Sequence, residues 1–246
     1  MIPAKDLFYG IVDNGIKVDI FQAEESLFLI KLFLKNSNEI DKSSFTILFR
    51  TLQYVFTKEL TLAITKLYEE EKKDKRYKIR SIPYALKLLE ESANELIIEQ
   101  KPSFIKKLVK CGFNEDYLNR LDDAQITNET VKYFHDNLPP FVLKDFKNMS
   151  KSLNALKTAR NKVIAHSEAI LTSDLPRTTW DEIEQLIDYA KEFLGIVGIG
   201  YLSIAYEDDN GNHFLSSDAK RTTRAMERLL QKAGILSEDG SSPLML

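Results

Sequence analysis

The sequence predicts an all-α protein, a bundle of long antiparallel helices. Nine glycines and seven prolines make up about 6.5% of the 246 residues, against roughly 12% in average proteins. β-Sandwiches need a turn about every 8 to 12 residues. No glycine lies between Gly15 and Gly112, or between Gly112 and Gly195. The residues that tight hairpins require are therefore scarce along most of the chain.

The N-terminal part is predicted to be helical after a short irregular start. Asn14–Gly15 lies between alternating apolar residues and predicts either a small hairpin or a turn before the first helix. Two long amphipathic helices follow, over 19–35 and 43–72, because apolar residues recur there at spacings of three and four. A further helix is expected to open at Ser81–Pro83 and to extend to Gln100.

The middle of the chain is predicted to alternate short helices with breaks at proline. Short helices are expected over 103–110 and 127–136. Pro139–Pro140 precedes a long helix that starts near Phe141 and carries the candidate site described below.

The C-terminal part opens with a helix start signal. Thr179 is followed three residues later by Glu182, a capping-box pattern at the start of a helix that runs toward Tyr206. A turn is expected over 208–212 and a last helix over 217–232, before a frayed tail over 235–246. Because no repeat or linker divides the chain, residues 1–246 are expected to form a single helical domain.

Charge and composition limit the classes of function. A net charge of −3 gives no global attraction to nucleic acid, so RNA binding requires a local basic patch. The lone Cys111 and three histidines lack the spacing of a zinc site, and we expect neither a metal nor a cofactor. The N-terminus does not resemble a signal peptide. The longest uncharged stretch, 193–206, is shorter than the roughly 20 residues of a membrane span, so we expect a buried helix in a cytoplasmic protein.

The stretch most informative about function surrounds Arg160. Steps of four and three along the preceding helix trace an apolar seam in which an arginine stands in place of an apolar residue: Val142, Phe146, Met149, Leu153, Leu156, Arg160 and Val163. A guanidinium on a packing face must reach water or find an anion, because burying an unpaired charge is costly. Arg160 therefore predicts either an ion pair within the chain or a site for an external anion.

His166 lies six residues beyond Arg160. At about 100° per residue, the two side chains do not point in one direction on a continuous helix. Either the helix breaks between them, or a two-fold related copy of the chain brings a second Arg160 and His166 to the same cleft.

Arg160, Asn161 and His166 resemble the signature of HEPN domains (higher eukaryotes and prokaryotes nucleotide-binding), in which an arginine and a polar residue precede a histidine at short spacing. The surrounding sequence is ARNKVIAHSE after a long helix, with TLAITKLYEE and a lysine-rich turn upstream. It is most similar to AbiU-type HEPN proteins, which are linked to phage abortive infection. The resemblance covers residues 20–205, roughly.

The resemblance implies a bundle that dimerises through the motif helices and, in active members, a metal-independent endoribonuclease of a phage-defence or toxin type. His166 suits proton transfer at neutral pH, since imidazole titrates near a pH of about 6.5. Arg160 offers a planar, permanently charged fork to the phosphorane that forms when a 2′-hydroxyl attacks its neighbouring phosphate. Asn161 positions either group by hydrogen bonding. The alternative is a non-catalytic HEPN-like module that binds RNA or a nucleotide without turnover.

The expected partners are RNA, a second copy of the chain and, for a toxin, a regulatory antitoxin. The expected RNA contacts are basic side chains beside the motif and in the upstream turn: Lys157, Lys162, Lys72, Lys73, Lys75 and Arg76. The upstream run also fits a solvated helix end, where lysines suit the helix dipole. An antitoxin that modifies a nearby tyrosine lacks local support, because position 168 is Glu and no tyrosine lies within ten residues of His166.

Other motifs fit structural roles better. Gly198 and Gly200 form only part of a dinucleotide-binding fingerprint, so close helix packing is the preferred interpretation. The segment 208–212 lacks the alternating ligands of a calcium loop and predicts a turn. His135 and His213 have no identifiable acid or nucleophile partner in the sequence, and neither is assigned to the site.

Overall fold

The computed structural model describes residues 3–70, 79–137, 149–161 and 178–237. Over these residues the protein is helical without β-strands, as predicted, with an isolated antiparallel bridge between Glu207 and His213. The elements, in chain order, are α1 (Ala4–Ile11), the π-helical turn η1 (Val12–Ile16), α2 (Lys17–Lys35), α3 (Ser37–Lys42), α4 (Thr46–Leu67), α5 (Ile82–Glu91), α6 (Lys101–Lys110), α7 (Glu115–Leu118), α8 (Asp123–Asn137), α9 (Met149–Ala159), α10 (Trp180–Val197), the π-helical turn η4 (Gly198–Leu202) and α11 (Phe214–Lys232).

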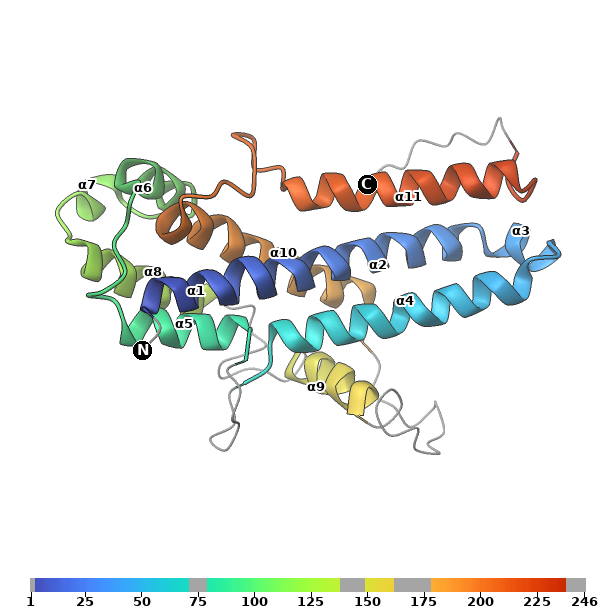
Figure 1. Ribbon diagram of the computed structural model, residues 1–246, viewed down its shortest axis with the longest axis horizontal. Coiled ribbons are helices and arrows are strands. Elements are labelled where there is room, and N and C mark those ends of the chain that lie inside the picture. The colour runs from blue at the N-terminus through green and yellow to red at the C-terminus, as the bar shows by residue number, and fades with distance from the viewer. Residues whose placement is uncertain (1–2, 71–78, 138–148, 162–177, 238–246) are drawn as a thin grey trace.

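The long helices α2 and α4 form the central pair of the bundle. They lie side by side as an antiparallel pair joined through α3 (Figure 1). α11 packs along α2, and α9 packs against α4, so that α11 and α9 lie on opposite sides of this pair (Figure 1). The shorter helices α5 to α8 gather at the end of the molecule nearest the N-terminus. This arrangement confirms the predicted bundle of long antiparallel helices.

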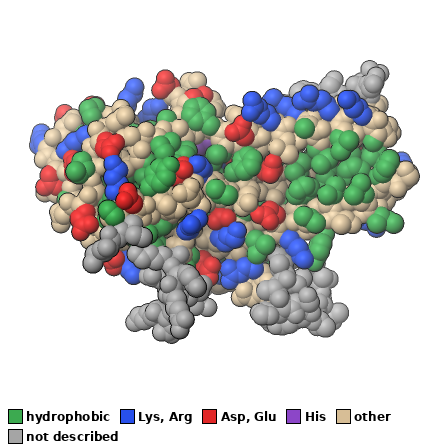
Figure 2. All heavy atoms as spheres, in the orientation of Figure 1, with side chains coloured by type: hydrophobic (Ala, Val, Ile, Leu, Met, Phe, Trp, Pro, Cys, Tyr) green, Lys and Arg blue, Asp and Glu red, His purple; other side chains and the backbone are tan. Residues whose placement is uncertain are grey.

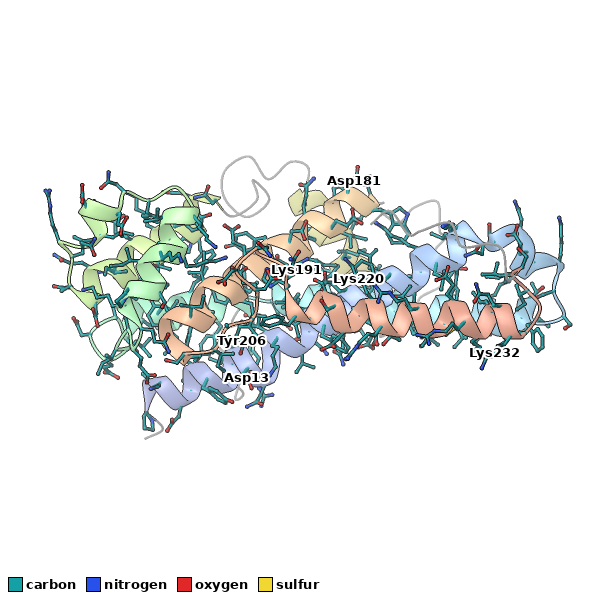
Figure 3. All side chains as sticks on the ribbon, turned by 90° about the horizontal axis from the view of Figure 1, so that it is seen from above. Asp13, Asp181, Lys191, Tyr206, Lys220 and Lys232 are labelled. Carbon is teal, nitrogen blue, oxygen red and sulfur yellow. The ribbon has the colours of Figure 1, made fainter. Side chains whose placement is uncertain are left out.

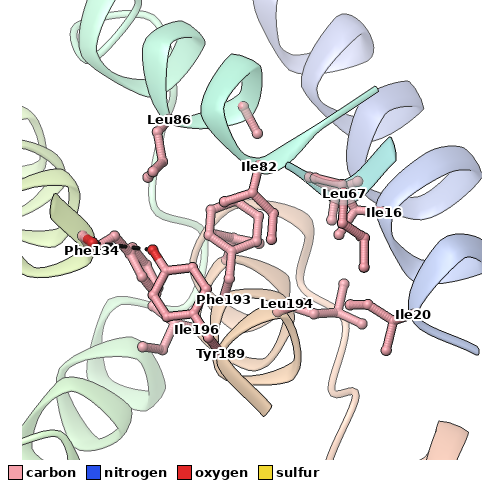
Figure 4. Close-up of a cluster of buried hydrophobic side chains, with 14 of the residues drawn as sticks. Ile16, Ile20, Leu67, Ile82, Leu86, Phe134, Tyr189, Phe193, Leu194 and Ile196 are labelled. Atoms are coloured by element: carbon pink, nitrogen blue, oxygen red, sulfur yellow. Dashed lines mark hydrogen bonds between the residues drawn. The ribbon is translucent and has the colours of Figure 1, made fainter. Parts of the chain in front are cut away.

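The helix α10 runs through the centre of the main core. Tyr189, Phe193, Leu194 and Ile196 lie among apolar side chains from α2, α4, α5 and α8 (Figure 4). The stretch 193–206 is helical as far as Leu202 and largely buried there, as predicted. In the ranges that the structure describes, no helix is both long and apolar enough to span a bilayer.

Neither of the two alternatives expected at Asn14–Gly15 forms: there is no hairpin, and there is no turn that precedes the first helix. Residues 12–16 make a π-helical turn that joins α1 directly to α2. Gly15 suits this turn because a Cβ there would lie only 2.5 Å from the Arg80 Cβ. A buried face with a spacing of four residues overrides the local turn signal: Phe8, Val12, Ile16 and Ile20.

Two other boundaries differ from the sequence-based expectation. The helix expected over 43–72 is shorter at both ends, because α4 starts at Thr46 and ends at Leu67. Ser81 does cap α5 by accepting a hydrogen bond from the Tyr84 amide, but α5 ends at Glu91 rather than at Gln100. The start near Phe141 lies outside the described residues.

The C-terminal signals are largely confirmed. Thr179 and Glu182 form the reciprocal hydrogen bonds of a capping box at the start of α10. The turn over 208–212 is held by the Asp208 carboxylate, which accepts hydrogen bonds from the Asn210 and Asn212 amides. The last helix starts three residues earlier than expected, at Phe214.

Two glycines, Gly200 in η4 and Gly10 in α1, lead to a stability prediction. A Cβ at Gly200 would lie 2.7 Å from the ring of buried Phe104, whereas a Cβ at Gly10 in α1 meets nothing within 4 Å. Gly200→Ala should therefore lower the free energy of unfolding by about 1 to 3 kcal/mol through overpacking. Gly10→Ala should raise it by up to about 1 kcal/mol, because alanine favours helix. Urea unfolding of both variants tests this, and equal effects would contradict it.

Candidate functional site

Arg160 and Asn161 lie at the C-terminal end of α9, where the helix widens into a π-helical turn. Leu153 and Leu156 are buried where α9 packs against α4. The side chain of Arg160 is only 22% exposed, so it lies at the edge of the packing face. The predicted seam is thus confirmed for the residues that the structure describes, in which Arg160 follows the buried Leu153 and Leu156.

Among the described residues, two groups contact the Arg160 guanidinium. Its Nε donates a hydrogen bond to the Asn161 Oδ1 at 3.0 Å. Its Nη1 lies 3.7 Å from the Oε2 of Glu69, which forms an ion pair but is too long for a direct hydrogen bond. The ion pair within the chain, one of the two alternatives for Arg160, is therefore present. A partly exposed pair of this kind contributes about 1 kcal/mol or less.

Glu69 is held firmly just beyond the end of α4. The hydroxyl of its neighbour Tyr68 donates a buried hydrogen bond to the Leu186 carbonyl in α10. The hydroxyl of Ser81, the cap of α5, donates to the Glu69 carbonyl at 2.7 Å. Glu69 is thus tied to α5 and, through Tyr68, to α10, so its carboxylate stands at a defined place beside Arg160.

A pocket of ≈ 360 Å³ lies beside this ion pair, and Glu69 forms part of its wall. Lys66 and Arg80 supply cations and Asp19 supplies a second carboxylate. Lys66 lies 3.2 Å from Asp19, and Arg80 donates to the Asn14 carbonyl at 2.9 Å. Burial raises the pKa of Asp19 despite the neighbouring Lys66. The pocket is therefore polar and charged of both signs.

Part of the predicted site falls outside the described residues. His166, Lys162 and the basic residues of the upstream run lie there: Lys72, Lys73, Lys75 and Arg76. Lys157 is half-buried in the last turn of α9, one turn before Arg160. The structure thus brings Lys157, Arg160 and Asn161 together, and the position of His166 relative to Arg160 stays a prediction.

Sequence reasoning missed the groups that meet Arg160. Glu69 is 91 positions away in the sequence, and Arg80, which shares the pocket wall with Glu69, was not among the expected RNA contacts. The sequence indicated only that an arginine on a packing face needs an anion. Only the packing of α9 on α4 shows which carboxylate supplies it.

A second charged cluster surrounds His213, for which the sequence had indicated no acid partner. The structure corrects this, because the His213 Nε2 lies 3.4 Å from the Glu207 Oε2. Glu207 also accepts a hydrogen bond from Lys107, and both carboxylate and imidazole are about nine-tenths buried. The Nδ1 of His213 is buried without a hydrogen-bond partner in the part of the chain that the structure describes. His135, by contrast, is exposed on α8.

Burial lowers the pKa of His213, aided by the charges of Lys191 and Lys107 and opposed by Glu207. The imidazole is therefore neutral at neutral pH, and its contact with Glu207 is not an ion pair there. This cluster binds α6 to the segment before α11. We assign it to the structure of the bundle rather than to the site around Arg160.

Potential metal ligands do not gather in the described ranges, where no group of three or more His, Cys, Asp or Glu side chains could hold an ion. Among the described residues, the Arg160 region contains one guanidinium, one amide and the neighbouring charged side chains.

Comparison with known protein families agrees with the class that the motif indicated. The model of the AbiU2 family (HEPN_AbiU2) matches residues 29–222, which include Glu69, Arg160 and His166. The match covers most of the chain, and this protein therefore belongs to the AbiU2 family of HEPN proteins. Searches of curated proteins and of solved structures find no match.

The lowered pKa of His213 predicts an acid dependence of stability. The unfolded chain binds a proton near the ordinary value of 6.5, whereas the folded chain resists it. Below about pH 6.5 the unfolded state therefore binds more protons, and the free energy of unfolding falls as the pH is lowered. His213→Gln should lose less stability than the wild type between neutral pH and about pH 5.

Urea unfolding at several pH values measures this difference. His135→Gln removes an exposed imidazole instead and should keep the acid dependence of the wild type. An unchanged acid dependence in His213→Gln would show that the buried imidazole is not the titrating group.

Proposed function

We propose that this protein is an endoribonuclease of a phage-defence or toxin type. In this proposal two copies of the chain form a composite site in which Arg160, Asn161 and His166 cleave RNA. Membership of the AbiU2 family supports the HEPN part of the proposal. The observation that carries the site is Arg160 itself, a guanidinium oriented by Asn161 and by a long ion pair with Glu69.

The state of Arg160 suits the binding of a phosphate. The hydrogen bond to Asn161 uses the Nε, and Glu69 stands at 3.7 Å from Nη1 without a direct hydrogen bond. A guanidinium binds phosphate through two parallel hydrogen bonds that are charge-assisted and stronger than neutral ones. An RNA phosphate therefore competes well for Arg160 against a partly exposed ion pair of about 1 kcal/mol or less.

The proposed reaction is a transesterification within RNA. The ribose 2′-oxygen attacks the adjacent phosphorus, a bond from that oxygen to phosphorus forms, and the bond to the 5′-oxygen breaks. One His166 accepts the proton of the 2′-hydroxyl, and the His166 of the second copy gives a proton to the leaving 5′-oxygen. Arg160 stabilises the charge that develops on the phosphorane oxygens. The products are a 2′,3′-cyclic phosphate and a 5′-hydroxyl.

A second candidate is a non-catalytic module that binds RNA or a nucleotide. The pocket of ≈ 360 Å³ beside Glu69, with Lys66 and Arg80 in its wall, favours this alternative because its size lies within the range of small-ligand sites. Both candidates predict RNA binding. They differ in turnover: the first cleaves RNA and requires His166 to do so, whereas the second binds without cleavage.

Single substitutions test the catalytic assignment. Arg160→Ala and His166→Ala should each lower the rate of RNA cleavage by about 100-fold or more, the usual effect of losing a charge stabiliser or a proton-transfer group. The matched control is Arg50→Ala, which removes an exposed arginine that pairs with Asp41 near the start of α4. Gel-based cleavage assays with purified proteins of equal helicity measure the effect. Undiminished cleavage by either site variant would reject the assignment.

The proposed chemistry also predicts the products and the conditions of cleavage. Since a base, an acid and a permanent cation come from the side chains, cleavage should proceed in the presence of EDTA. An RNA with a single 2′-deoxyribose at the cleaved position should resist cleavage there, because the attacking hydroxyl is missing. Mass spectrometry of the fragments should show a terminal 2′,3′-cyclic phosphate. Cleavage of the deoxy-substituted RNA at that position would contradict the mechanism.

A further inference from the structure

The helix α11 is fixed to the body of the protein by one face. Ala219, Thr223 and Leu230 are buried where α11 packs along α2. Leu230 belongs to a small apolar cluster at the far end of the bundle, which also contains Leu32 and Phe33 of α2. The opposite face of α11 therefore has a defined orientation toward solvent.

This outer face carries a row of exposed cations, here called the basic row: Arg221, Arg224, Arg228 and Lys232. Their spacing of three, four and four residues places them on one side of the helix, over about 17 Å of its length. Figure 2 shows Lys and Arg side chains along the edge formed by α11, and Figure 3 shows α11 from above with Lys232 labelled at its end.

Most of the basic row is not neutralised within the part of the chain that the structure describes. Arg221 pairs with Asp218 at 3.0 Å. Arg228 donates to the Arg224 carbonyl, and no ion pair joins Arg224, Arg228 or Lys232 to a described carboxylate. In a chain of net charge −3, this row is a local excess of positive charge. Such an excess attracts a polyanion.

The chemistry of the row favours RNA over a lipid surface. Guanidinium groups bind phosphates through paired hydrogen bonds. A helix that lies on a membrane inserts its apolar face among the lipids, but the apolar face of α11 is already buried against α2. A row of cations along a rigid helix instead follows the successive phosphates of a strand.

We propose that the basic row of α11 binds the sugar-phosphate backbone of RNA, as a contact separate from Arg160; as a substrate contact, this rests on the proposed function. α11 and α9 lie on opposite sides of the α2–α4 pair (Figure 1), so the basic row and Arg160 bind different parts of a long RNA. The AbiU2 match ends at residue 222, before Arg224, Arg228 and Lys232. The contact therefore lies mostly outside the region that the family model describes.

Fluorescence anisotropy with labelled single-stranded RNA tests this contact, in a His166→Ala background that prevents cleavage. The variant Arg224→Gln with Arg228→Gln removes two cations from the row. The matched control, Arg120→Gln with Lys132→Gln, removes two exposed cations on and beside the short helices at the other end of the molecule. Circular dichroism verifies that both variants keep their helicity.

We expect the row variant to bind a long RNA roughly 10-fold more weakly at moderate salt, with the slope of log K against log salt reduced by about 1.4. The control should bind like the parent protein. A short oligonucleotide that occupies only one site should lose less affinity than the long RNA, because two linked contacts reinforce each other.

Three results would overturn the inference. One is unchanged binding of long RNA by the row variant, and another is an equal loss in the control, which would indicate a general charge effect. The third is a loss of binding to phosphatidylserine vesicles with no loss of RNA binding, which would identify a membrane surface.

Cleavage by the chain with native His166 is measured in parallel. If the chain with native His166 cleaves RNA but the row variant binds RNA unchanged, only the proposal for the basic row is refuted. If the row variant binds RNA more weakly but the chain with native His166 does not cleave it, only the nuclease proposal is refuted.

Discussion

The packing of α10 inside the main core determines where the candidate site lies. Tyr68, at the end of α4, is buried against α10 and donates its hydroxyl hydrogen bond to the Leu186 carbonyl. Burial raises the pKa of Tyr68, so the hydroxyl stays a donor. Moving the end of α4 would leave buried polar groups unpaired, at a cost of about 1 to 3 kcal/mol. Glu69 follows Tyr68 directly, and its place opposite Arg160 therefore depends on the core.

Buried ion pairs also set the surface that α11 presents. Lys191 of α10 pairs with Glu24 of α2 at 2.9 Å, and the Glu24 carboxylate also accepts hydrogen bonds from Ser216 of α11. Breaking such a pair by removing one partner leaves an uncompensated buried charge, which is strongly destabilising. These contacts join three helices near the start of α11. Together with the apolar contacts of Leu230, they fix the orientation of α11 about its own axis, so that its arginines face solvent.

The ion pair of Arg160 and the proposed anion site are compatible. Glu69 keeps the guanidinium oriented while no phosphate is bound, and the 3.7 Å separation makes this a weak partner. The same arrangement suits an RNA-binding module without turnover, so the distinction between the two candidates depends on His166. On the proposed mechanism, the core positions the cation and the motif supplies the proton transfer.

The local sequence was enough to predict the all-α class, the capping box at Thr179, the cap at Ser81 and the apolar seam that contains Arg160, because these features depend on residues within a few positions of one another. The spacing of Arg160, Asn161 and His166 resembled the HEPN signature, and the surrounding sequence resembled AbiU-type proteins, which the family match confirms. The tertiary structure decided the π-helical turn at Gly15, the pairing of Arg160 with Glu69 and that of His213 with Glu207. The first two depend on contacts between segments far apart in the chain, Gly15 with Arg80 and Arg160 with Glu69, and the third depends on the reversal of the chain between Glu207 and His213. Such contacts depend on how apolar faces pack, and a local pattern of residue types carries no information about which distant partner a face will meet.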